Sequence, residues 1–279
     1  MRPDGRKLKT VDPFFKIVPY LMPKRYDAQV FFETDLDYTS AKKYINAKRK
    51  EGIKLSFMSV FIAAYVRTVS QMPEMNRFIM NRKIYARNEL CVSFAILKDD
   101  VTRDDIMETT AKVKFEPTDT IFDVTKKMED AIKVNRNAEE TNFTDKLAKF
   151  FMGIPLLPGA IIGFLKALDK IGLLPKFLLD GIPFHTSMFI TNMASINMGS
   201  VYHHLYDFGT TSLFVGMGKM RDKTKNEGQK RRVIPIGVVA DERICAGATF
   251  AKAFGLTKKY LADPTVLETP PESVREDIK

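Results

Sequence analysis

The chain has 279 residues, 45% of them hydrophobic and 28% charged, a composition that excludes disorder, collagen-like repeats and a small disulfide-held scaffold. Its 44 Lys and Arg residues against 34 Asp and Glu residues give a net charge of +10, which could attract nucleic acid, an anionic membrane or coenzyme A. The basic residues form short groups without interleaved aromatic residues, so we predict solvated faces and no nucleic-acid partner.

Predicted strands and helices alternate through the first half of the chain. The most apolar helix contains Val60, Phe61 and Tyr65 at helical spacing, and Pro73 stops it. The elements predicted in this half are a strand at 28–35, helices at 38–51, 56–72 and 119–137, a hairpin at 78–87, and strands at 91–97 and 109–115.

The second half is predicted to contain strands at 186–192, 213–218 and 233–241 and a last helix from 247 to a stop before Pro264. Residues 146–182 are rich in apolar residues and proline, which predicts a hydrophobic helical insertion. The charged residues at 265–279 predict a mobile tail. Because no linker or repeat interrupts this order, we predict a single α+β domain over 1–279, built on a mixed sheet.

Cysteine and histidine are scarce in this sequence. Cys91 and Cys245 have no cysteine or histidine at metal-ligand spacing, so we expect no metal and a reduced, cytoplasmic protein. The 3 histidines restrict acid–base chemistry near neutral pH. The first residues lack an apolar signal core, and the longest uncharged run, 150–165, is too short and too rich in proline for a spanning helix.

Three motifs follow one another in a specific order in the carboxyl-terminal half. A strand MFITNMA (188–194) precedes a strand LFVGMGK (213–219), and a third strand ends in DERICAG (241–247). This order resembles the chloramphenicol acetyltransferase superfamily, and within it the catalytic domain of the dihydrolipoyl acyltransferases of 2-oxoacid dehydrogenase complexes. The signatures of that family are approximately FTISNLG, ILAVG and DHRxxDG. The front half agrees in its order of strands and helices, so the resemblance covers most of the chain.

The resemblance implies a two-layer sandwich of a mixed sheet and packed helices, assembled as a homotrimer with active sites at subunit interfaces. It implies that a coenzyme A thioester meets a thiol, hydroxyl or amine acceptor in a channel there. In the family, a histidine of the final motif deprotonates the acceptor, and a hydroxyl of the first motif stabilises the tetrahedral oxyanion.

The final motif departs from the family at its catalytic position. Aligning DERICAG with DHRxxDG retains Asp241, Arg243 and Gly247. Glu242 replaces the catalytic histidine, and Ala246 replaces the second aspartate. The alignment therefore makes Glu242 a candidate base and Arg243 and Gly247 candidate substrate-binding residues.

The first motif keeps a hydroxyl, because Thr191 takes the place of the oxyanion serine and Asn192 follows it as a substrate-binding candidate. His203 and His204, in SVYHHLYDFGT just before the second strand, are further candidate bases. His185, just before the first strand, is another. The alternative for all of these histidines is an ordinary polar residue in a turn.

The insertion has two interpretations. It is either a helical subdomain that packs on the trimer or covers the channel, or it is a peripheral membrane contact through 150–179 or a hydrophobic lid over a long acyl chain. Its expected apolar face consists of Ile161, Ile162, Leu165, Leu168 and Ile171, with Lys166, Asp169 and Lys170 opposite.

Two functions remain open at this stage. The first is a stand-alone acyltransferase that moves an acyl group from an acyl-coenzyme A thioester with a non-standard base. The second is a catalytically inactive protein that keeps the trimer as a binding or assembly module.

Overall fold

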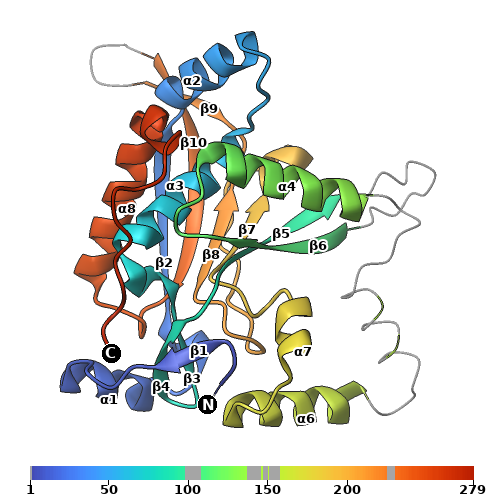
Figure 1. The fold of residues 1–279 in the computed structure, drawn as a ribbon, viewed down its shortest axis with the longest axis vertical. Helices are drawn as coiled ribbons and strands as arrows, with labels where there is room; N and C mark the ends of the chain where they lie inside the picture. Colours follow the sequence, from blue (N-terminus) through green and yellow to red (C-terminus); the bar gives the residue numbers. More distant parts are fainter. Residues whose placement is uncertain (1, 98–107, 137–145, 147–149, 151–157, 225–229) are drawn as a thin grey trace.

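One mixed β-sheet runs through the middle of the molecule (Figure 1). The computed structural model describes residues 2–97, 108–136, 146, 150, 158–224 and 230–279. The strands follow the order β2-β10-β8-β7-β5-β6, and β9 pairs with the amino-terminal part of β10. β7 is parallel to both β5 and β8, and the other pairs are antiparallel. The strands are β2 (Gln29–Asp37), β5 (Leu90–Leu97), β6 (Glu108–Phe115), β7 (Met188–Asn192), β8 (Leu213–Met217), β9 (Arg221–Thr224) and β10 (Lys230–Asp241).

Helices cover one face of this sheet. α3 is central, with α8 and α4 packed on either side of it (Figure 1), and Val60, Ile62 and Val66 of α3 are fully buried. Its first turn is fixed by a capping box between Ser56 and Ser59. The helices of this layer are α2 (Thr39–Lys50), α3 (Phe57–Gln71), α4 (Ile121–Arg136) and α8 (Gly247–Ala262). Short 3₁₀ turns are η1 (Arg25–Ala28), η2 (Pro73–Asn76), η3 (Met193–Ile196) and η4 (Pro264–Leu267). The predicted two-layer α+β architecture is confirmed.

Residues 199–206 run across the opposite face of the sheet. Val215 and Val238 belong to the core under the helices, so the neighbouring Gly216 and Gly237 face the other way. A Cβ built on either glycine would lie 2.4 Å from the carbonyl oxygen of Val201. Glycine at both positions therefore lets the segment lie directly on the sheet.

Replacing Gly237 with alanine should lower the free energy of unfolding by about 1–3 kcal/mol, because the new methyl group would displace the Val201 backbone. The matched control is Gly255→Ala in α8, where a Cβ would meet no atom within 4 Å. That variant should gain about 0.5–1 kcal/mol from helix propensity. Urea unfolding compares the two. Equal stability of both variants would contradict this account of the glycine.

A small three-stranded sheet and a helix that the sequence did not predict lie at one end of the molecule, around the amino terminus (Figure 1). The predicted hairpin is present as β3 and β4, with Asn81 and Arg82 at positive φ in its turn. The helix, α1, begins after its N-cap Asp12 and contains Pro19. The elements at this end are α1 (Pro13–Leu21), β1 (Gly5–Lys7), β3 (Arg77–Met80) and β4 (Lys83–Arg87).

The described part of the insertion forms α6 (Pro158–Ile171) and α7 (Lys176–Gly181), whereas 147–149 and 151–157 lie outside the described residues. The predicted polar face of α6 is wrong at Asp169, which is only 1% exposed. Its carboxylate accepts a hydrogen bond from the Arg2 guanidinium at 2.7 Å and contacts Nε2 of His185 at 2.9 Å. Ile171, predicted on the same apolar face as Leu165, is 64% exposed. Most of the expected apolar face, Ile161, Ile162, Leu165 and Leu168, does pack inward, and the ion pair adds Asp169 to the buried side.

The carboxyl-terminal segment, predicted to be mobile, lies against the body of the protein. Arg77 binds the Asp277 carboxylate through two hydrogen bonds, and the Arg275 amide donates to the Ser70 carbonyl. The Asp277 side chain is buried in this contact. These bonds anchor the segment, a result that a charged tail sequence does not reveal.

Candidate active site

A pocket of about 460 Å³ opens where β5 and β7 end. Thr191 and Asn192 enter it from β7, and His203 enters it from the segment that crosses the sheet. Most of the wall is aromatic or aliphatic, which suits an apolar or mixed ligand. Its apolar lining includes Met58, Phe94, Ile96, Ile132, Phe189, Ile196, Val201 and Phe214.

Thr191 stands at the polar side of this pocket. It pairs with Gly216 of β8 and is half-buried. Its hydroxyl lies 3.7 Å from the Met193 sulfur, a weak acceptor that a better one could replace. The hydroxyl can therefore donate to a ligand oxygen.

His203 has the geometry of a neutral base. Its ring stacks on Phe214 with centroids 4.2 Å apart, and its Nδ1 lies 2.8 Å from the carbonyl oxygen of His204. A carbonyl only accepts, so Nδ1 carries the proton and Nε2 keeps its lone pair. Burial lowers the pKa of His203, which keeps the ring neutral near pH 7.

Glu242 lies far from Thr191 within one chain. Thr191 pairs with Gly216, which pairs with Gly237, and Glu242 is five residues beyond Gly237. That separation is about 16 Å along the strand and about 10 Å across two strands. Glu242 is exposed, and its amide donates to the Ala28 carbonyl. The structure therefore does not bring the two aligned candidates together in a single copy.

Asp241 and Arg243 hold the turn that carries Glu242. Arg243 donates to both carboxylate oxygens of Asp241 at 2.7 Å and to the Met22 carbonyl. Both residues are buried, so their pairing directs the intervening side chain outward. Gly247 is exposed at the first position of α8. Neither Arg243 nor Gly247 lines the pocket of Thr191.

The other histidines do not line this pocket either. His204 is exposed and stacks on His203. His185 is buried, and its contact with Asp169 makes it part of the ion-pair network of α6.

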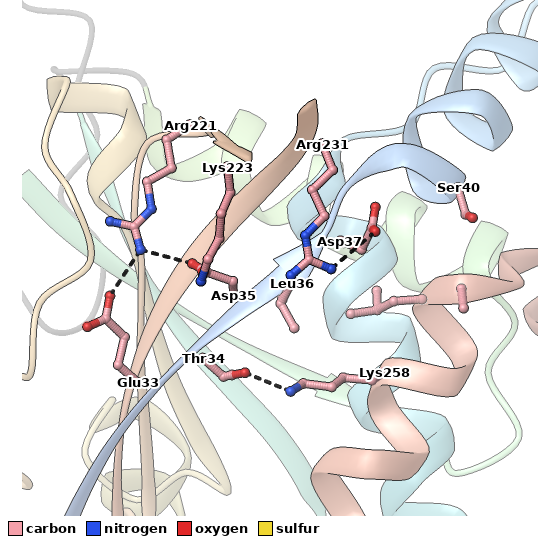
Figure 2. Close-up of a pocket in the computed structure, with 12 residues that line it drawn as sticks. Glu33, Thr34, Asp35, Leu36, Asp37, Ser40, Arg221, Lys223, Arg231 and Lys258 are labelled. Carbon is pink, nitrogen blue, oxygen red and sulfur yellow. Dashed lines mark hydrogen bonds and ion pairs between the residues drawn. The ribbon is translucent and has the colours of Figure 1, made fainter. Parts of the chain in front are cut away.

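A larger groove of about 750 Å³ surrounds β2, yet none of the predicted site residues lines it. Figure 2 shows that its basic side chains are engaged: Arg221 with Glu33 and Asp35, and Lys258 with Thr34. Because carboxylates already neutralise much of this charge, the groove is less suited to an added anion than its cations alone suggest.

Both thiols are buried away from the pocket. Cys91 is 3% exposed and Cys245 is 5% exposed. Burial raises the pKa of Cys91 and raises that of Cys245 to about 12. Among the described residues, no group of three or more His, Cys, Asp or Glu residues is arranged to hold a metal ion. Within the same ranges, no helix combines the length and apolarity needed to cross a bilayer.

Comparison with known proteins gives a result at the level of structure. No protein-family model matches the chain, and no curated protein is similar to it in sequence. Chloramphenicol acetyltransferase superposes with a TM-score of 0.58 at 10% identity, over 92% of this chain and 99% of that chain. A truncated catalytic core of the 2-oxoacid dehydrogenase multienzyme complex from Thermoplasma acidophilum gives 0.57 at 14% identity, over 93% and 99%. The cubic core of the pyruvate dehydrogenase multienzyme complex gives 0.57 at 13% identity, over 90% and 87%.

The chain therefore has the chloramphenicol acetyltransferase-like fold that its motifs predict. More particularly, it shares this fold with the catalytic cores of 2-oxoacid dehydrogenase complexes. The likeness is one of fold, so the chemistry has to be argued from the site itself.

Sequence reasoning missed the walls of the pocket. Ile132 of α4 and Phe94 of β5 come from segments far from the first motif. The sequence predicted Phe214 only as a strand residue, whereas in the structure its ring stacks on the ring of His203. Alternation along β8 could have placed Phe214 on the face of Thr191, because Phe214 pairs with Phe189, two residues before Thr191 on β7.

Proposed function

We propose that this protein is an acyltransferase that takes an acyl group from a coenzyme A thioester and transfers it to a thiol, hydroxyl or amine. The observation that carries the proposal is that the Thr191 hydroxyl, Asn192 and the His203 ring line one largely apolar pocket. Solved proteins of the same fold include chloramphenicol acetyltransferase and a probable dihydrolipoamide acetyltransferase, which supports this reaction class.

In the proposed mechanism, His203 is the base that accepts the proton of the acceptor group. Nε2 removes the proton of the acceptor, whose freed electron pair attacks the thioester carbonyl carbon. The Thr191 hydroxyl donates to the resulting oxyanion. Collapse of the tetrahedral intermediate breaks the C–S bond, and the departing coenzyme A thiolate receives the proton from the imidazolium. This reaction needs no metal ion and no redox partner, because every proton and bond in it is accounted for.

Glu242 remains the competing base, and it requires a second copy of the chain. We propose a homotrimer in which Glu242 of one copy approaches the pocket of the next. Exposed apolar side chains beside the pocket and on β2 support such an interface, since they would otherwise face water. These are Phe31, Ile196, Met198 and Tyr202. The buried reduced thiols suit the cytoplasm as the compartment.

A thiol-release assay with acyl-coenzyme A of increasing chain length and a panel of acceptors tests the proposal. Thr191→Val should lower kcat by about 10²–10³-fold, because the oxyanion loses its donor while the side-chain volume is kept. Thr191→Ser is the matched control and should retain activity. Binding of acyl-coenzyme A without any turnover would favour the inactive binding module. If no acyl-coenzyme A binds by calorimetry, the acyltransferase proposal fails.

A further inference from the structure

The outer face of α1 is apolar and exposed. Phe14, Ile17 and Leu21 recur at helical spacing, and Phe14 and Leu21 are 70% and 72% exposed. Tyr20 is exposed beside them, whereas Phe15 on the inner side packs against the core. Apolar residues thus lie on both sides of α1, and those of the outer side are largely exposed. Such a face is expected to meet something other than water.

The insertion presents a similar outer face. Leu165, Leu174 and Leu179 form a small core of their own. Phe164 and Leu173 instead point away from that core, with 62% and 65% of their surfaces exposed. Since α6 already has its own apolar core, these outward side chains are not needed to hold it in place.

The two faces lie at the same end of the molecule. Figure 1 shows α1 and α6 at one end, with the small sheet of β1, β3 and β4 between them. Arg2 connects this sheet to α6 through Asp169, and Arg82 in the hairpin turn lies 5.7 Å from the ring centre of Tyr20 on α1. The exposed apolar residues are therefore spread over a broad end of the protein rather than gathered in one groove.

Basic residues surround these apolar faces. The exposed cations on α1, α6, α7, the small sheet and the adjoining turns are Arg6, Lys7, Lys9, Lys16, Lys24, Arg82, Lys83, Lys170 and Lys176. The exposed acidic residues of the same elements are fewer: Asp12, Asp27 and Asp180. Aromatic and aliphatic side chains within a basic surround match the headgroup region of an anionic bilayer.

We propose that this end of the protein, formed by α1 and α6 with the intervening small sheet, docks peripherally on an anionic membrane surface. The helices lie in the plane of the interface, with Phe14, Ile17, Phe164 and Leu173 inserted among the headgroups and the lysines against anionic lipid. The pocket of Thr191 is not part of this contact, so the proposal is independent of the acyltransferase activity.

Vesicle flotation of the full chain tests this docking. At low salt, binding to vesicles of phosphatidylcholine with phosphatidylglycerol should exceed binding to phosphatidylcholine alone by at least about tenfold, and added salt should reduce it. The variant with Phe14→Glu, Ile17→Glu, Phe164→Glu and Leu173→Glu should lose at least about tenfold in binding, with its circular dichroism unchanged. The matched control is Val134→Glu, which alters an exposed residue of α4 away from this end and should bind as the wild type does.

Several outcomes would overturn the proposal. One is no binding to anionic vesicles at low salt, and another is equal binding by the wild type and the fourfold variant. A fourfold variant that dissociates in light scattering would show instead that a second copy covers these faces. Each readout is separate from thiol release, which the fourfold variant should retain, so failure of the docking is distinguishable from failure of the proposed activity.

Discussion

Replacing His203 with asparagine should lower kcat for coenzyme A release by about 10²–10⁴-fold. The variant amide can still donate to the His204 carbonyl, where Nδ1 of the histidine now donates, so the segment should keep its path. What it lacks is the basic lone pair of Nε2. Steady-state kinetics at saturating acyl-coenzyme A measures the loss, and an unchanged melting temperature would exclude unfolding as its cause.

The pH profile gives a second readout of the same residue. The base works only when neutral, and burial lowers the pKa of His203 below its ordinary value of 6.5. Activity should therefore rise with pH through a midpoint below 6.5 and stay level above neutrality. If Glu242 of a second copy is the base, His203→Asn should be nearly silent and Glu242→Gln should abolish turnover, which would contradict our assignment.

Replacing Asp169 with asparagine should lower the free energy of unfolding by about 1.5–3 kcal/mol, because the buried Arg2 loses its carboxylate acceptor on α6. The Asp169 carbonyl and Asp4 still accept hydrogen bonds from Arg2. These bonds reduce the loss of stability but do not replace the negative charge of the Asp169 side chain. Asp207→Asn is the matched control, because the Lys166–Asp207 pair is exposed and should contribute less than about 1 kcal/mol. Urea unfolding compares both variants with the wild type.

The stability difference should depend on pH in a defined direction. Burial alone disfavours the Asp169 carboxylate, but the hydrogen bond from His185 and the charge of Arg2 more than offset this and lower its pKa. A lowered carboxyl pKa gives stability that is complete at neutral pH and is lost as the pH falls through that pKa. The gap between wild type and Asp169→Asn should therefore narrow in acid. A gap that stays constant from neutral pH to pH 3 would count against the pairing.

The parts of the fold that sequence could predict are those defined by local periodicity. α3 and β10 carry continuous apolar patterns, and both were predicted close to their observed limits. α1 was missed because Pro19 stands inside it, although Asp12 and Pro13 are signals of a helix start. The buried side of Asp169 was mispredicted because its partner, Arg2, is 167 residues away in the chain. A hydrophobic pattern in the sequence cannot show that a distant cation stabilises a buried carboxylate.

The candidate site, like the fold, has parts that the sequence could predict and parts that it could not. The motif predicted Thr191 in its strand, and proximity in sequence made His203 a candidate. That Glu242 lies about 16 Å farther along the sheet follows only from strand register, which pairs Thr191 with Gly216 and Gly216 with Gly237. A motif alignment compares residues one by one and contains no information on which copy of a chain supplies each of them.

Because both cysteines are buried, the folded protein should not react with thiol reagents. The chain has only 2 cysteines, and burial raises the pKa of each. A chromogenic disulfide added to a reaction therefore records the product thiol with no background from the enzyme. The same reagent added during denaturation reports when Cys91 and Cys245 become reachable. One optical signal can thus count turnovers in the native protein and time its opening, without any engineered label.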